Sequence, residues 1–328
     1  MVKIGLIGLG GISGAHIAAY RRYPDVEIAC AADGKGKEAY SFSMLPESTR
    51  LYTDYKEMIE CEELDAVDIC APSHLHREIT VYALNHGLHV LCEKPMALTS
   101  EDAEIMVSEA KKSGKVLMIA QIIRFSKPYA YLRELVRGGE LGRPVHVFMN
   151  RLSSIPRWRL GANGQNAAAN GGVMLDLSIH DVDMIYSVFG EPNTVKGIYH
   201  CESAEDPNDY YSAALGYDGF EVVVSGGFYE AEIAFTREFY AIFEKGDLRL
   251  DRSGKLYRSG EELDICDIVY KGEIKGLNIE LTSVFVEEMG RFIECVKTGM
   301  PCETALPEST AGGIKLAKRI LDEMGDPV

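Results

Sequence analysis

The first third of the chain alternates short apolar runs with segments of helical spacing. Apolar runs of strand length lie at residues 3–7, 26–32, 64–71, 89–92 and 116–123. Helical segments lie between them, such as 77–86 before Gly87 and 100–113 before Gly114. Strands separated by helices favour right-handed βαβ units and a parallel sheet. Residues 1–122 are therefore predicted to form an α/β domain with a doubly wound parallel sheet.

The second part of the chain has a different pattern. Residues 194–267 alternate apolar and polar positions with a period of two, and turns such as Asp218-Gly219 interrupt them without any helix-length segment. This arrangement favours antiparallel pairing. Helices are predicted at 128–136, 176–189, 278–298 and 307–324, and a further strand at 144–151. The sequence thus predicts an α+β domain over 123–328 with a mostly antiparallel, open sheet, through which a homodimer or homotetramer would form.

The first apolar run enters a glycine-rich turn. Gly8, Gly10 and Gly11 follow the strand, and Ile12 leads into a helix at 15–20. Such a turn lets a pyrophosphate approach the backbone and places its charge at the helix N-terminus. Ser13 stands at the third glycine position of this fingerprint, so either the helix lies slightly farther from the strand or a small hydroxyl is tolerated. The turn predicts dinucleotide binding by a Rossmann domain.

Asp33 ends the second apolar run, at the distance from the glycine turn that ribose recognition requires. A carboxylate there accepts hydrogen bonds from the ribose hydroxyls and repels a 2′-phosphate. NAD is therefore the predicted cofactor, although Lys35 leaves NADP possible.

Lys94 is the most informative residue of the chain. The apolar run 89–92 leads directly into Glu93, Lys94 and Pro95, and strand ends are where α/β enzymes hold their chemistry. A lysine beside a carboxylate can protonate or polarise a substrate oxygen, and the proline fixes the turn that orients it. The alternative is a solvent-exposed ion pair that follows a strand.

A second candidate group follows the glycine pair Gly171-Gly172. Asp176 and His180 are four residues apart, so on a helix they share one face and can form a carboxylate–imidazole pair. Such a pair suits proton abstraction from an alcohol. The alternative is an ordinary amphipathic helix with a polar pair.

These motifs in this order resemble the glucose-fructose oxidoreductase, inositol dehydrogenase and MocA family of nicotinamide-dependent oxidoreductases, over essentially the whole chain. The resemblance rests on Gly8-x-Gly10 with His16, Ala71-Pro72-Ser73 with His76, Glu93-Lys94-Pro95, Arg124-Phe125, and Gly171-Gly172 through Asp176 and His180. It departs from the family pattern at Ser13 and at Ser73, where many relatives have asparagine.

The resemblance implies that Lys94, Asp176 and His180 form the catalytic group and that Arg124 faces the substrate. It also implies that the cofactor lies along Ala71, Pro72, Ser73, His76, Glu93 and Lys94. The expected reaction is reversible oxidation of a secondary hydroxyl on a sugar, cyclitol or related polyol. His180, oriented by Asp176, would take the proton, while Lys94 stabilises the alkoxide.

Three other functions stay open for a member of such a family. It could be a glycosidase that uses a retained NAD, an enzyme that reduces an imine or tetrapyrrole double bond, or a non-enzymatic regulator that binds nucleotide. Lys94, Asp176 and His180 together argue against the regulator, because a sensor needs no proton relay. The segment 155–166 contains Trp158, two arginines and several amides. It is either a sugar-binding loop or a surface loop with one anchoring tryptophan.

Composition narrows the class of protein. With 46% hydrophobic residues in 328, the chain can bury two cores, and its net charge of −16, without any basic run, argues against nucleic-acid and membrane-surface partners. The eight cysteines include no CxxC motif, and the histidines have no metal-ligand spacing, so reduced thiols and no metal are expected. Glycines interrupt the N-terminal apolar run, which argues against a signal peptide. A cytoplasmic protein is expected.

Overall fold

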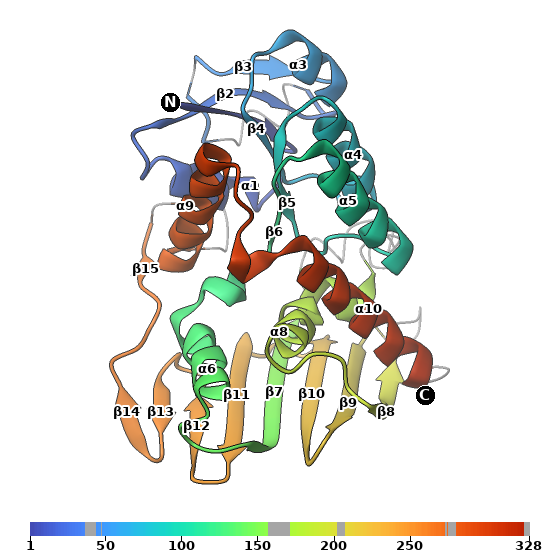
Figure 1. Cartoon of the computed structure of the whole chain (residues 1–328), viewed down its shortest axis with the longest axis vertical. Helices are drawn as coiled ribbons and strands as arrows, with labels where there is room; N and C mark the ends of the chain where they lie inside the picture. Colours follow the sequence, from blue (N-terminus) through green and yellow to red (C-terminus); the bar gives the residue numbers. More distant parts are fainter. Residues whose placement is uncertain are drawn as a thin grey trace. The chain divides into compact units, whose positions relative to one another are not determined.

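The computed structural model describes residues 1–36, 44–46, 48–156, 171–201, 207–272, 274 and 280–324. The chain folds into two compact units. Figure 1 shows the chain coloured from blue at the N-terminus to red at the C-terminus. The first unit comprises residues 1–97, 101–125 and 268–311, and the second comprises 98–100, 126–267 and 312–328. No helix in the described ranges has the length and apolar character that crossing a bilayer requires.

The first unit is built on a six-stranded sheet in the order β3-β2-β1-β4-β5-β6, and every pair of neighbours is parallel. The strands are β1 (Val2–Ile7), β2 (Val26–Ala32), β3 (Arg50–Tyr52), β4 (Ala66–Ile69), β5 (His89–Glu93) and β6 (Leu117–Ala120). The central strands are buried along most of their length, as their apolar runs require. The predicted doubly wound parallel sheet is confirmed.

The carboxyl ends of these parallel strands meet at one edge of the sheet. The strand order reverses beside β1, because β2 follows on one side and β4 on the other. Ligands of doubly wound proteins bind outside the carboxyl ends at this switch point. Gly8, Asp33, Ala71 and Lys94, four of the predicted cofactor-binding residues, follow β1, β2, β4 and β5 and so lie at this edge of the sheet.

The helices of the first unit are α1 (Ser13–Tyr20), α3 (Tyr55–Cys61), α4 (His76–Asn85), α5 (Ser100–Ser113) and α9 (Ser283–Thr298), with short turns η1 (Ser73–Leu75), η2 (Ile122–Phe125) and η4 (Glu303–Ala305). A two-stranded ribbon, β15 (Val269–Tyr270) with β16 (Leu281–Thr282), precedes α9.

The sequence suggests a single domain boundary after residue 122. In the structure, residues 268–311 return to the first unit. Every residue of α1 is buried, and an apolar core joins α1 to the side of α9 that carries Val284, Phe285 and Met289. A helix that is buried on every side has to be packed against other elements on every side. Here α9, from late in the sequence, supplies that cover, and local periodicity gives no sign of which helix it packs against.

The second unit is built on an eight-stranded sheet in the order β14-β13-β12-β11-β7-β10-β9-β8. Only β7 and β10 are parallel among the neighbours, so the predicted mostly antiparallel sheet is confirmed. The strands are β7 (Pro144–Ser154), β8 (Thr194–His200), β9 (Asp209–Tyr217), β10 (Phe220–Tyr229), β11 (Thr236–Phe243), β12 (Gly246–Leu250), β13 (Leu256–Arg258) and β14 (Glu261–Leu263).

Helices cover one face of this sheet (Figure 1). They are α6 (Lys127–Gly138), α8 (Ile179–Phe189) and the part of α10 (Pro307–Met324) from Gly312 onward. A π-helical turn, η3 (Met174–Ser178), leads into α8 and packs on β10 at Gly226. A Cβ at Gly226 would overlap the hydroxyl of Ser178, so the missing side chain is what lets η3 approach the sheet.

Gly226→Ala is expected to lower the free energy of unfolding by about 1–3 kcal/mol, because the added methyl overfills a packed contact. It would also lie 2.8 Å from the ring of Tyr211. Gly138→Ala is the control, since a Cβ there meets nothing within 4 Å and alanine favours a helix over glycine. Urea unfolding measures both variants. A Gly226→Ala protein as stable as the wild type would contradict this packing.

Candidate active site

The glycine turn after β1 combines a tightly enclosed position with an open one. Gly8 has a φ of +91°, and a Cβ there would lie 2.7 Å from backbone atoms of Cys70 and Ala71, so only glycine fits. Gly10, two residues on, is exposed, and a Cβ there meets nothing within 4 Å. The open space beside Gly10 is the room that a pyrophosphate needs at the N-terminus of α1.

The Ser13 hydroxyl donates a hydrogen bond to the carbonyl oxygen of Gly10 at 2.7 Å. Ser13 is buried, so this contact satisfies both polar groups inside the turn. Of the two possibilities open from the sequence, the structure shows the second one: a small hydroxyl takes the third glycine position and closes the loop.

Asp33, at the end of β2, faces the glycine turn. One carboxylate oxygen accepts the backbone N–H of Leu9 at 2.7 Å, and the other accepts that of Lys35 at 2.9 Å. A carboxylate has about four lone-pair positions. The group can therefore hold the turn and still accept two ribose hydroxyls, as the predicted cofactor role requires.

Lys94 lies in the turn that follows β5. It is half-buried, whereas Glu93 before it and Pro95 after it are buried, and the peptide bond between Lys94 and Pro95 is cis. The Glu93 carboxylate points into the unit: one oxygen accepts the backbone N–H of Lys94 at 2.9 Å, and the other lies 3.0 Å from Nε2 of His16. Glu93 therefore contacts the backbone of Lys94 as well as flanking it in sequence.

His76 connects the loop after β4 to the Lys94 turn. Its Nδ1 lies 2.7 Å from the carbonyl oxygen of Pro95, and its Nε2 lies 2.9 Å from that of Ala71. Both ring nitrogens thus face carbonyl oxygens, which only accept hydrogen bonds, and burial lowers the pKa of His76. The ring is 1% exposed, so the structure gives His76 a role in packing these loops, and its contact with a cofactor stays a prediction.

Arg124, in η2, is also buried. Its Nη1 donates to the carbonyl oxygen of Thr304 at 3.1 Å within the first unit. This contact ties η2 to η4, and the predicted contact between Arg124 and a substrate stays a prediction. Trp158 and the rest of the predicted sugar-binding loop beyond Pro156 lie outside the described residues.

The glycine pair before Asp176 forms a turn that a buried acid holds. Gly171 and Gly172 have φ of +81° and +62°, a conformation that favours glycine. The backbone N–H of Val173 donates to Oδ2 of Asp209 at 2.8 Å, and a Cβ at Gly172 would lie 3.3 Å from the same oxygen. Asp209 was not predicted from the sequence. The one sign of it there is an acidic residue at the start of a β-strand.

The segment with Asp176 and His180 is more irregular than the plain helix that the sequence predicts. Asp176 lies in the π-helical turn η3, and His180 lies in the first turn of α8. From 173 to 185 every residue is buried except these two, which are half-buried. π-helical turns are rare and occur mostly at functional sites. Hydrogen bonding between Asp176 and His180 stays a prediction.

A buried ion pair fixes α8 against the sheet. The Arg151 guanidinium on β7 donates to both oxygens of Asp181, at 2.6 and 3.0 Å. Both side chains are buried, and burying one without the other would be costly. Because Asp181 follows His180 directly, this pair fixes the rotation of the helix that carries the candidate base.

The comparisons with known proteins define the class. Residues 2–121 match the family model described as an oxidoreductase family with an NAD-binding Rossmann fold, and residues 129–249 match the GFO/IDH/MocA C-terminal domain. The chain belongs to this oxidoreductase family, as its motifs suggested, and its first domain is an NAD-binding Rossmann domain.

Its relatives include dehydrogenases and reductases of sugars and cyclitols. The chain is 29% identical over 227 residues to 1,5-anhydro-D-fructose reductase of Ensifer adhaerens, a match over 69% of this chain and 65% of that protein. It is 29% identical over 228 residues to the NADP-dependent scyllo-inositol 2-dehydrogenase of Bacillus subtilis, over 68% and 69% of the two chains. The match therefore spans about two thirds of these relatives.

Solved structures share the fold. Levoglucosan dehydrogenase, in complex with NADH and levoglucosan, superimposes with a TM-score of 0.81 at 20% identity, over 98% of this chain and 97% of that one. An oxidoreductase from Agrobacterium radiobacter, in complex with NAD⁺, L-tartaric acid and magnesium, also gives 0.81, at 18% identity over 99% and 96% of the two chains.

Asp33→Asn is expected to shift the NADP-to-NAD ratio of kcat/KM at least ~10-fold toward NADP, which corresponds to about 1.4 kcal/mol. The amide oxygen can still accept the N–H of Leu9 and keep the glycine turn, while the contact to the N–H of Lys35 and the charge that repels a 2′-phosphate are lost. Steady-state kinetics with both cofactors test it. A wild-type protein that prefers NADP tenfold would contradict the assigned role of Asp33.

Proposed function

We propose that this protein is an NAD(P)-dependent dehydrogenase that reversibly oxidises a secondary hydroxyl of a sugar, cyclitol or related polyol. The observation that carries the proposal is the position of Lys94, half-buried at the sheet edge that also holds the glycine turn and Asp33. The activities named for the relatives support the same substrate class.

The residues of this chain have separable roles in that reaction. Gly8, Gly10, Gly11 and Ile12 would accommodate the pyrophosphate, and Asp33 would bind the ribose. NAD, when bound, supplies the hydride acceptor. A ring nitrogen of His180 takes the hydroxyl proton, Asp176 orients the ring, and Nζ of Lys94 stabilises the negative charge on the substrate oxygen.

This assignment needs no metal, because the ammonium of Lys94 supplies the positive charge that a Lewis acid provides in other alcohol dehydrogenases. Dialysis against a chelator is accordingly expected to leave turnover unchanged.

Lys94→Ala and His180→Ala are each expected to lower kcat by roughly 100-fold or more and to leave NAD affinity nearly unchanged. Both groups are assigned to the alcohol and its proton, and neither to the dinucleotide. A panel of sugars, cyclitols and sugar acids, followed by the absorbance of reduced nicotinamide, identifies the substrate. Stopped-flow kinetics and calorimetry then compare the variants.

Lys112→Ala and His86→Ala are the matched controls, since both residues are exposed in the first unit, Lys112 on α5 and His86 directly after α4. They should behave as the wild type. Near-normal turnover of Lys94→Ala or His180→Ala on the true substrate would remove that residue from the catalytic group. Glycoside cleavage without net reduction of NAD would instead identify a glycosidase with an internal redox cycle.

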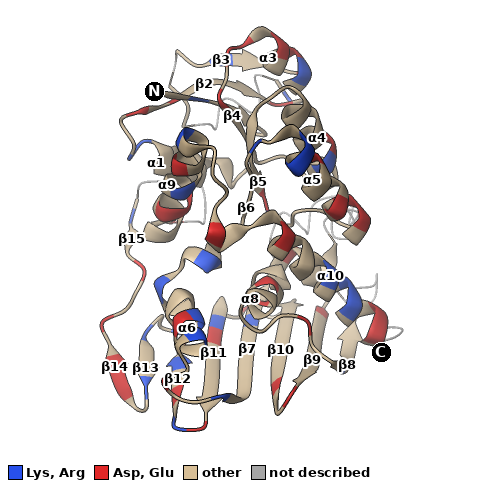
Figure 2. Cartoon of the chain, in the orientation of Figure 1, with Lys and Arg blue, Asp and Glu red and all other residues tan. Residues whose placement is uncertain are grey.

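We also propose that the protein forms a homo-oligomer through the face of the eight-stranded sheet opposite its helices. Val223, Phe148 and Tyr240 lie side by side across β10, β7 and β11, within a groove of about 940 Å³. Figure 2 shows few charged residues on β9 and β10, whose only acids are Asp209 and Glu221. An apolar row of this kind on a broad sheet suits a self-complementary contact.

Phe148→Glu is expected to convert the oligomer to monomer, because two copies of the row would bring buried carboxylates together. Light scattering after gel filtration measures the mass. Phe235→Glu, at an exposed position outside the strands, serves as the control and should leave the mass unchanged. A wild-type monomer, or a Phe148→Glu protein of unchanged mass, would contradict this interface.

A further inference from the structure

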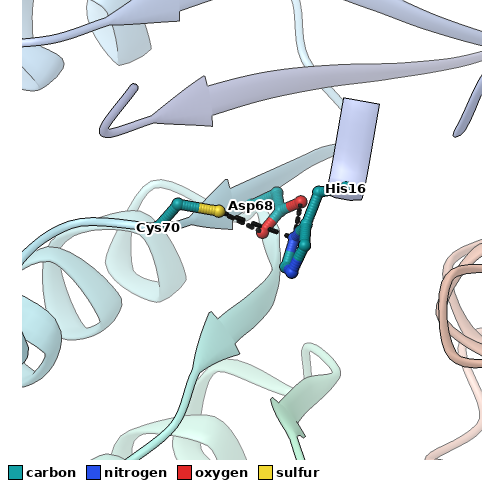
Figure 3. A group of neighbouring side chains, drawn as sticks. All are labelled: His16, Asp68 and Cys70. Carbon is teal, nitrogen blue, oxygen red and sulfur yellow. Dashed lines mark hydrogen bonds and ion pairs between the residues drawn. The ribbon is translucent and has the colours of Figure 1, made fainter. Parts of the chain in front are cut away.

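A buried cluster of ionisable side chains adjoins the Lys94 turn inside the first unit. Figure 3 shows His16 from α1, Asp68 from β4 and Cys70 just after β4 turned toward one another. Glu93 at the end of β5 and Glu288 on α9 belong to the same cluster. His16, Asp68 and Glu288 are fully buried. Burial of several ionisable groups without solvent is costly unless they neutralise one another.

The ring of His16 links two carboxylates. Nδ1 lies 2.8 Å from Oδ2 of Asp68, and Nε2 lies 3.0 Å from Oε1 of Glu93. Ionised carboxylates only accept hydrogen bonds, so both ring nitrogens have to carry protons and the ring is an imidazolium. Burial by itself lowers the pKa of His16, but the negative charge of Asp68 raises it well above 6.5. For Glu93, burial raises the pKa, and the hydrogen bond from His16 brings it below its usual value.

Three other ionisable groups face His16, and the pKa of each is shifted toward the neutral form. Burial raises the pKa of the Cys70 thiol to about 12, and burial together with the charge of Glu93 raises that of Glu288 well above its usual value. Burial and Asp68 likewise raise the pKa of Tyr20. Cys70 and Tyr20 are therefore neutral at neutral pH, burial favours the neutral form of Glu288, and the ring of His16 lies between the carboxylates of Asp68 and Glu93.

The connection continues to Lys94. While one oxygen of Glu93 receives the His16 proton, the other accepts the backbone N–H of Lys94 at 2.9 Å. A carboxylate held at both oxygens has one side-chain conformation available, and it fixes the backbone from which the lysine side chain extends. Groups that act on a substrate need such support, since a displacement of about 1 Å can cost 100-fold in rate.

We propose that His16 is a positioning residue for Lys94: its doubly protonated ring fixes Glu93, and Glu93 fixes the backbone of Lys94 and thereby its ammonium group. The proposal rests on the catalytic role proposed above for Lys94.

The same atoms do not make a good metal centre. His16, Asp68 and Cys70 offer ligand atoms within 4.8 Å of one another. Ligand atoms around a tetrahedral zinc, at 2.0–2.3 Å from the ion, lie roughly 3.3–3.7 Å apart. The 2.8 Å between His16 and Asp68 is a hydrogen-bond length, and a neutral thiol is a poor ligand.

The kinetic test compares His16→Asn with Cys70→Ala. The Cys70 thiol sulfur lies 3.5 Å from Nδ1 of His16, the nitrogen that also faces Asp68, but it is not bonded to Glu93 in the structure. Cys70→Ala is therefore the matched control. His16→Asn is expected to lower kcat at least ~10-fold, with NAD affinity within about twofold of the wild type. In the Lys94→Ala background, His16→Asn should have no further effect on kcat, because it acts through Lys94.

A milder variant adds a pH profile. Asp68→Asn removes the charge that keeps His16 protonated and leaves Glu93 intact. Its kcat is expected to fall as pH rises through the lowered pKa of His16, at a pH where wild-type kcat is still level. A separate measurement, ¹⁵N NMR of histidine-labelled wild type, should show both nitrogens of His16 protonated at neutral pH, whether or not any variant folds.

Three results would overturn the proposal: an equal loss of kcat from His16→Asn with and without Lys94, a neutral His16 ring by NMR, or one equivalent of tightly bound metal. Normal turnover of Lys94→Ala would instead contradict the proposed function, and the NMR result would still report whether the charged cluster exists.

Discussion

The close approach of β1 and β4 is the constraint on which the first unit depends. A Cβ at Gly8 would lie 2.7 Å from the backbone of Cys70 and Ala71, so a single missing side chain allows the two strand ends to meet. Because β5 is the next parallel strand, the same approach brings α1, β4 and the Lys94 turn around one interior point. The buried ring of His16 occupies that point and bonds to both neighbouring strands.

The second unit uses comparable devices to orient a short irregular helix. Glycines with positive φ begin it, Asp209 binds its first backbone N–H, and the Arg151–Asp181 pair holds it to β7. The absent side chain of Gly226 leaves room for the π-helical turn beside the sheet. In both units, a buried polar contact and a glycine that no other residue can replace position the half-buried candidate groups. These groups are Lys94 in the first unit, and Asp176 and His180 in the second.

Local sequence patterns were sufficient to predict the two sheets and most elements, because apolar periodicity and glycine turns act over short distances. The limits of α10 were predicted as they are found, and Asp33 and the glycine turn lie where their spacing placed them. Contacts between distant segments could not be predicted. The cover of α1 by α9 and the Asp68–His16–Glu93 connection depend on which surfaces meet after folding. Asp68 inside the apolar run 64–71, together with His16 and Glu93 in the family motifs, was the sign that the sequence offered of the last of these.

The proposed function requires that Lys94 and His180 act on the same substrate hydroxyl during hydride transfer. A crystal structure of the protein with NAD and the substrate found in the panel tests it most directly. One substrate oxygen is expected about 3 Å from both Nζ of Lys94 and a ring nitrogen of His180, or one water away. A productive complex in which either group lies far from the oxidised carbon would contradict it.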